Sequence, residues 1–120
     1  MHKNALRQLE TSYTQRDLKR FVARNRQISL ISIDRAELGP WIGAQVGDLI
    51  LASRVGHQGD GLTLWFPETI SYAEAARRVV RLFGWQGQRP RFMKSDGTDI
   101  RPFRSKAGLE MLAAFDAVPA

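Results

Sequence analysis

Apolar positions in the N-terminal part of the chain predict two short helical segments. The first has apolar residues at helical spacing, namely Leu6, Leu9 and Tyr13. The second has an i, i+3, i+4 stripe, formed by Leu18, Phe21 and Val22. Thr14 precedes the second segment and Asp17 follows three residues later, which is the pattern of a capping box with Asp in place of Glu or Gln. We therefore expect both segments to be helical.

The middle of the chain has the periodicity of strands. The isoleucine-rich run 28–33 predicts a strand buried on both faces, and Asp34 with Glu37 predicts one helical turn that Gly39-Pro40 ends. Trp41 is then expected in a loop. Residues 48–55 and 62–66 flank the glycine-rich loop 56–61 and predict a hairpin. Its second strand alternates, with leucine or phenylalanine at 62, 64 and 66, and this alternation predicts a half-buried strand.

The C-terminal part predicts a helix, a hairpin and a second helix. Ser71 and Glu74 form a capping box before an amphipathic run that Gly84 ends. Asp96-Gly97 predicts a two-residue turn between 91–94 and 99–103, which would pair Lys94 with Asp99 and Phe92 with Arg101. Pro102 would confine the second strand to a sheet edge. The last predicted helix carries four apolar residues, Leu109, Met111, Leu112 and Phe115.

These elements predict an α+β fold with a mainly antiparallel sheet built from hairpins, because hairpins join most of the strands. We expect a single small domain over residues 1–120, since 43% hydrophobic content in 120 residues suits one core. Within it, residues 1–26 form a basic helical N-terminal segment, residues 27–115 form the α+β body and residues 116–120 form a frayed tail.

Positive charge is concentrated in two blocks. Residues 1–26 carry seven basic and two acidic side chains, and residues 77–106 carry nine basic and two acidic ones. The segment between them is net acidic, and the whole chain has a formal charge of +6. Such an excess on a small protein favours polyanionic partners. A solvated helix face, with Glu74 pairing Arg77 and Arg78, is the plain alternative for the helical part.

The second block supplies the candidate binding residues, in which arginine predominates and suits bidentate contacts with phosphate. They are Arg77, Arg78, Arg81, Arg89, Arg91, Phe92, Lys94, Arg101, Arg104 and Lys106. An exposed aromatic among cations is typical of single-strand binding, so Phe92 is a candidate for base stacking. The alternative interpretation makes Phe92 and Phe103 core residues, which leaves only the cations exposed.

Catalytic and metal-binding patterns are weak in this sequence. Cysteine is absent, and the two histidines, His2 and His57, lack metal-ligand spacing. His57 near Asp60 offers a base without an assigned nucleophile. We therefore expect no cofactor, no metal and no enzyme activity. The long apolar run of a spanning helix and a signal peptide are also absent, which favours a cytosolic protein without membrane association.

Three function classes follow from these observations. The first is a basic nucleic-acid-binding module, for DNA or RNA, held mainly by phosphate contacts. The second is a protein–protein interaction or inhibitor module, of the kind carried by mobile elements, that places its basic face on an acidic partner surface. The third is a small metal-independent nuclease that uses arginines and His57.

Overall fold

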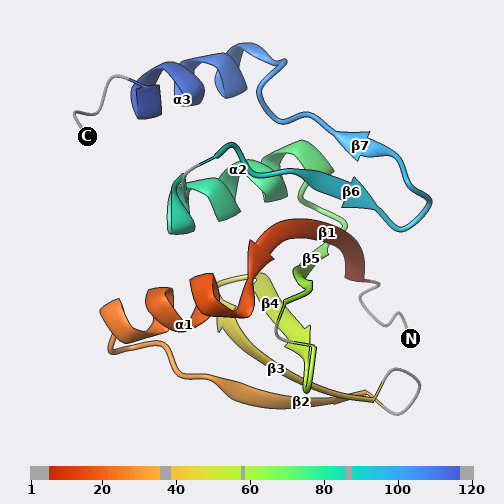
Figure 1. Ribbon diagram of the computed structural model, residues 1–120. Coiled ribbons are helices and arrows are strands. Elements are labelled where there is room, and N and C mark those ends of the chain that lie inside the picture. The colour runs from red at the N-terminus through yellow and green to blue at the C-terminus, as the bar shows by residue number, and fades with distance from the viewer. Residues whose placement is uncertain (1–5, 36–38, 58, 86–87, 117–120) are drawn as a thin grey trace.

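The computed structural model describes residues 6–35, 39–57, 59–85 and 88–116, which form one antiparallel sheet and three helices (Figure 1). In chain order the elements are β1 (Leu6–Thr14), α1 (Gln15–Arg24), β2 (Ile31–Arg35), β3 (Gly39–Val46), β4 (Leu49–Arg54), β5 (Gly61–Pro67), α2 (Tyr72–Phe83), β6 (Phe92–Lys94), β7 (Asp99–Ile100) and α3 (Lys106–Asp116). The predicted α+β class and the mainly antiparallel sheet are confirmed.

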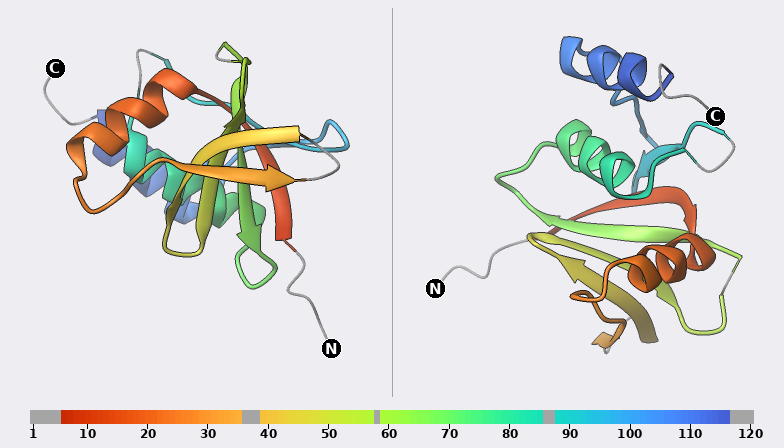
Figure 2. Two further views of the ribbon diagram at one scale, coloured as in Figure 1. Left: turned by 90° about the horizontal axis from the view of Figure 1, so that it is seen from below. Right: turned by 90° about the vertical axis from the view of Figure 1, so that its left-hand side faces the viewer.

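The seven strands are ordered β2-β3-β4-β5-β1-β6-β7. β1 lies inside the sheet, where Glu10 is opposite Thr63 of β5 on one side and Met93 of β6 on the other. In the right-hand view of Figure 2, α3, α2 and the β1–β5 pair follow one another from top to bottom, with β4, β3 and β2 below them. The main core fills the space between one sheet face and the helices α1 and α2.

The first predicted helix is wrong, because residues 6–14 form the strand β1. Leu9, Thr11 and Tyr13 are buried while the residues between them are more exposed, which is the period of two expected for a strand. Leu9 and Tyr13 are four positions apart, a spacing that fits one face of a strand as well as one face of a helix. Pairing with both β5 and β6 decides between the two structures.

The caps predicted for the next two helices are confirmed. α1 begins after Thr14, whose backbone N–H and hydroxyl donate to the Asp17 carboxylate at 2.8 and 3.2 Å. α2 begins after Ser71, whose hydroxyl oxygen accepts the Glu74 backbone N–H at 3.1 Å, and it ends at Gly84 with a φ of 70°. α3 confirms the last predicted helix, with Met111 buried against the core. Residues 117–120 of the predicted frayed tail lie outside the described residues.

β5 is buried on both faces, so the predicted half-buried strand is wrong, although its alternation is confirmed. Leu62, Leu64 and Phe66 enter the main core. On the opposite face, Trp65 packs edge-on against Trp41 with 4.9 Å between ring centroids. Trp41 lies in β3, a strand that the sequence pattern did not reveal, and not in the expected loop.

β2 is an edge strand, which corrects the prediction of a strand buried on both faces over residues 28–33. The strand begins only at Ile31, which is exposed, while Ile28 and Leu30 pack against the core before it. Asp34 continues β2 and does not start a helical turn. Residues 36–38, where the rest of that turn was expected, lie outside the described residues.

The β6–β7 hairpin exists, but its predicted register is wrong by one residue. Phe92 lies opposite Ile100 and Met93 opposite Asp99, with a three-residue loop over 95–97. A two-residue type I′ turn needs positive φ at both central residues. Gly97 has a φ of 89°, whereas the described residues include no non-glycine residue with positive φ. The predicted edge position is confirmed, because β7 is the last strand of the sheet. The predicted length is wrong, because β7 covers only Asp99–Ile100 and Pro102 lies beyond it.

Candidate nucleic-acid interface

Arg77 is held inside the protein rather than offered to a partner. Its side chain is only 12% exposed and projects from α2 toward the segment that connects β7 to α3. One terminal nitrogen, Nη1, donates to the Pro102 carbonyl at 3.3 Å and to the Ser105 hydroxyl at 3.0 Å. The guanidinium Nε lies 3.6 Å from the Glu74 carboxylate. These contacts give Arg77 a structural role.

Arg78 and Arg81 lie on a different part of the surface, beside the β3–β4 turn. Both line a hollow of 370 Å³ whose other lining residues include Asp48. Arg81 Nη1 also lies 3.6 Å from the Glu74 carboxylate, whereas the sequence pattern predicted that Glu74 would pair with Arg77 and Arg78. Two acidic side chains therefore offset the positive charge here, which supports the interpretation of this helix face as a solvated surface.

Lys94 is engaged by an aromatic ring at the start of α2. Its ammonium nitrogen lies 4.7 Å from the centroid of the Tyr72 ring, and the Arg7 guanidinium carbon lies 5.2 Å from the same centroid. Both distances are within the range of cation–π contacts. Lys94 thus links the β6–β7 hairpin to α2.

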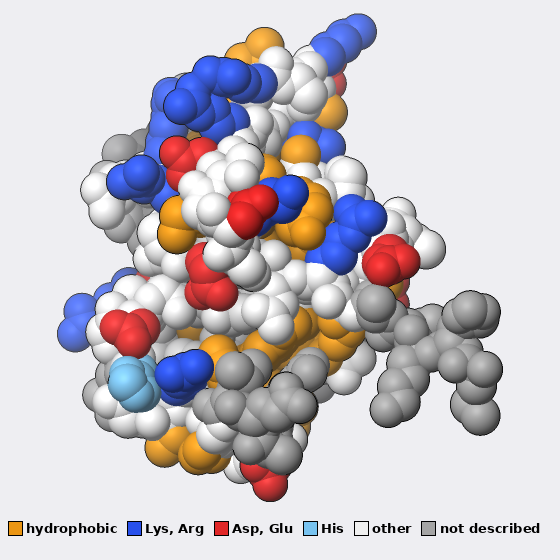
Figure 3. Space-filling view, turned by 90° about the vertical axis from the view of Figure 1, so that its right-hand side faces the viewer, with side chains coloured by type: hydrophobic (Ala, Val, Ile, Leu, Met, Phe, Trp, Pro, Cys, Tyr) orange, Lys and Arg blue, Asp and Glu red, His pale blue; other side chains and the backbone are white. Residues whose placement is uncertain are grey.

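Four of the predicted arginines come together on one groove of 480 Å³. Arg89 and Arg91 precede β6, and Arg101 and Arg104 follow β7, so the pairing of the two strands brings both pairs to the same place. Asp99 is the one acidic residue in the groove lining. Lys106 is exposed at the start of α3, two residues after Arg104. In Figure 3, Lys and Arg side chains gather in the upper part of the molecule.

Phe92 lines the bottom of this groove but is almost completely buried. Its side chain is 2% exposed and its ring centroid lies 6.4 Å from that of Tyr13 in the main core. The ring presents no face on which a base could stack. Of the two interpretations that the sequence allowed, the structure places Phe92 in the core.

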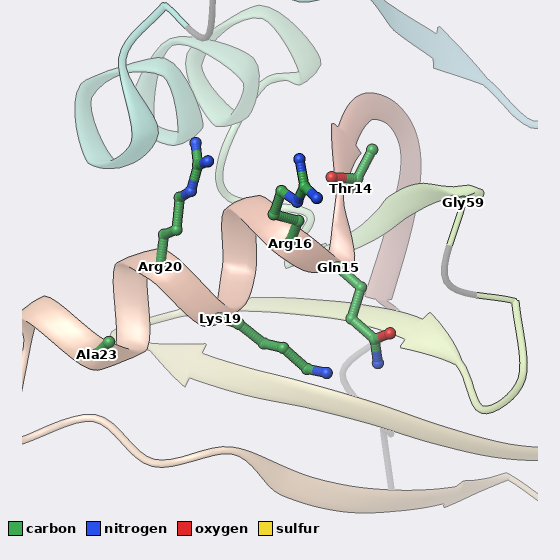
Figure 4. A pocket seen from close by; sticks show the side chains of 7 residues that line it. All are labelled: Thr14, Gln15, Arg16, Lys19, Arg20, Ala23 and Gly59. Atoms are coloured by element: carbon green, nitrogen blue, oxygen red, sulfur yellow. The ribbon is translucent and has the colours of Figure 1, made fainter.

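A second group of cations lies on α1, and the list of candidate residues drawn from the sequence omitted it. Arg16, Lys19 and Arg20 line a hollow of 730 Å³ between α1 and Gly59 in the β4–β5 loop. In Figure 4 the Arg16 and Arg20 side chains point toward α2, whereas Lys19 points toward β3 and β4. The charge of residues 1–26 was the available signal, but the pattern did not show where these side chains would lie.

The two basic blocks meet at a backbone contact between Ser12 and Arg91. The Ser12 N–H donates to the Arg91 carbonyl at 3.0 Å, and the Arg91 N–H donates to the Ser12 hydroxyl oxygen at 2.8 Å. A hollow of 430 Å³ next to this contact is lined by Arg16 and Arg20 together with Pro90 and neighbouring residues. Pro90 also lines the arginine groove, so this hollow, whose lining includes the acidic Asp17, adjoins that groove.

Two titratable side chains near these surfaces have shifted pKa values. Burial raises the pKa of Tyr13, and the Asp17 carboxylate raises it further, so the phenol stays protonated while it donates to the Gly84 carbonyl at 2.7 Å. Hydrogen bonds from the Thr98 side chain and backbone lower the pKa of Asp96. Asp96 therefore stays ionised in the hairpin loop.

Catalytic and metal-binding arrangements have little support among the described residues. His57 Nδ1 lies 3.2 Å from the Asp60 carboxylate in the β4–β5 loop, and both side chains are largely exposed. Over the described ranges, no group of three His, Cys, Asp or Glu side chains could hold a metal ion. The same part of the chain has no helix long and apolar enough to cross a membrane.

Comparison with known proteins provides no family or relative. The chain matches no family model, no curated protein and no solved structure. Any functional argument therefore depends on the geometry of the described residues.

Proposed function

We propose that this protein is a nucleic-acid-binding module that holds phosphates on the groove lined by Arg89, Arg91, Arg101 and Arg104. The observation that carries the proposal is the convergence of two separate arginine pairs on one groove with a single acid, Asp99. Planar guanidinium groups suit phosphate oxygens because they donate two parallel hydrogen bonds. The neighbouring cations of α1 extend the positive surface along which a backbone would run.

Four phosphate contacts set the expected salt dependence of binding. Each phosphate neutralised contributes about −0.9 to the slope of log K against log salt on duplex DNA, and about −0.7 on single strands. Four contacts on a single strand therefore give a slope of roughly −3, or about a 50-fold loss of affinity between about 50 and 200 mM salt. Engagement of α1 would make the slope steeper. We also propose that the protein is cytosolic, as predicted from the sequence.

The test is a fluorescence-anisotropy titration with labelled single- and double-stranded oligonucleotides of DNA and of RNA. The variant Arg101→Gln/Arg104→Gln removes two charges from the groove. Arg26→Gln/Arg78→Gln removes two exposed charges elsewhere and is the matched control. We expect the groove variant to lose affinity and to reduce the salt slope by about 1.5, whereas the control keeps most of both.

Two results would count against this proposal. Equal losses in the groove variant and its control would show that net charge alone attracts the oligonucleotide. No detectable binding at about 50 mM salt with micromolar protein would refute the proposal. That result would favour the second function class, in which the same arginines bind an acidic protein surface.

A further inference from the structure

The arginine-lined groove has an apolar floor that phosphate binding does not require. Its lining includes Pro90, Ile100, Pro102, Phe103, Leu109 and Leu112. Leu109 projects from α3 with 54% of its surface exposed. The other large exposed apolar side chains of the described residues are Leu6, Ile31, Val55 and Met93, and none of them lines this groove.

Contacts behind the floor hold α3 at a defined position beside the C-terminal end of α2 (Figure 1). Trp85 packs against Phe103 with 5.4 Å between ring centroids and against Phe115 of α3 with 5.1 Å. Arg77 fixes the connecting segment through Pro102 and Ser105. The groove is therefore preformed, and its 480 Å³ falls in the range of about 300–1,000 Å³ found for small-molecule sites.

We infer that the groove binds single-stranded nucleic acid and seats one unpaired base on the apolar floor while the arginines hold the flanking phosphates. This inference rests on the proposed function and adds the class of nucleic acid. Covering the face of a base with an apolar surface is energetically favourable. Base faces are accessible only in a single strand, because in a duplex they stack against the neighbouring base pairs. The arginines at the rim supply the positive charge that binds the phosphates on either side of that base.

The experiment compares wild-type protein with Leu109→Asp on single-stranded and duplex oligonucleotides of the same sequence, for both DNA and RNA. Val55→Asp is the matched control, because Val55 is 56% exposed and lies in the β4–β5 connection away from the groove. Both variants add one negative charge to an exposed position, and circular dichroism checks that each remains folded. A competitor with one abasic position tests the base contact without any change to the protein.

The inference predicts that wild-type protein prefers the single strand, with a loss of about tenfold or more for Leu109→Asp and a small loss for Val55→Asp. The abasic competitor should be weaker than its parent strand. Equal affinity for duplex and single strand, with equal losses in both variants, would overturn this inference and leave the phosphate-binding proposal standing. Absence of binding to every oligonucleotide would overturn both.

Discussion

Arg77 and Arg81 provide a direct test of how burial changes the contribution of a charged side chain to the free energy of unfolding. Both lie on α2 and both have a nitrogen 3.6 Å from the Glu74 carboxylate. Arg77 is 12% exposed and makes two further hydrogen bonds, whereas Arg81 is 55% exposed. Replacing each with Met keeps the apolar stem and removes the charge. The two variants therefore differ mainly in the contacts that the guanidinium makes.

From the structure we expect Arg77→Met and Arg81→Met to lower the free energy of unfolding by different amounts. Arg77→Met removes two charge-assisted hydrogen bonds, of which the bond to Pro102 is long. The partly buried Pro102 carbonyl loses this donor, whereas the exposed Ser105 hydroxyl still accepts the Gly108 N–H. A loss of about 2 kcal/mol in unfolding free energy is expected, or about 6–10 °C in Tm for a domain of this size. Arg81→Met breaks one exposed ion pair, which contributes about 0.5 kcal/mol or less.

Urea unfolding followed by circular dichroism measures both free energies, and an unchanged m value confirms that the variants unfold like the wild type. Native-state hydrogen exchange then shows whether the loss is concentrated in α3, which Arg77 ties to α2 through the segment before it. The reasoning is refuted if Arg77→Met and Arg81→Met destabilise the protein equally. It is also refuted if α3 keeps its full protection in Arg77→Met.

Three other changes test separate parts of the structure. Phe92→Ala should lose about 3–5 kcal/mol of stability, since the ring is buried, and a thermal melt that stays near the wild-type midpoint would contradict its core position. Gly97→Ala should lose about 1 kcal/mol in urea unfolding because its φ of 89° disfavours a Cβ, and an unchanged midpoint would contradict the turn geometry. The pKa of Tyr13 is raised from 10.0 in the folded protein, so the unfolded chain loses that proton first and stability should fall as the pH rises above about 10. Tyr13→Phe should lessen this alkaline loss in urea unfolding between about pH 8 and 11, and an equal loss in both proteins would refute the assignment.

Local signals predicted the parts of the fold that depend on neighbouring residues. The capping residues Thr14 and Ser71 act within one helical turn, so their helices could be located from the sequence. β3 could not be located from the sequence, because close contact with β4 restricts which residues fit in it. A Cβ at Gly43 would lie 2.7 Å from that of Ala52, and the glycine that this contact requires weakens the strand pattern.

The candidate site was predicted as a region and not as a set of side chains. The basic block 77–106 was evident, but a helical pattern shows only which residues leave the apolar stripe. It cannot show that the segment before α3 covers Arg77 or that Tyr72 engages Lys94. The hairpin register likewise depends on the loop length, because Asp96-Gly97 is compatible with loops of two or three residues. The positions of Arg77 and Lys94 thus depend on contacts between distant segments, and the register depends on the loop.

The position of β1 has a consequence for how this chain acquires its structure. Glu10 pairs with Thr63, 53 residues later, and with Met93, more than 80 residues later. At a synthesis rate of about 5–20 residues per second, β1 would wait roughly 4–16 s for its second neighbour. Such distant pairings slow folding, because the entropy of closing a long loop is lost before the contacts form. Stopped-flow refolding should accordingly show a rate typical of sheet proteins, and microsecond folding would contradict it. The nascent β1 has two unpaired edges until β5 is made and one until β6 is made, and such edges are exposed to aggregation and to capture by chaperones.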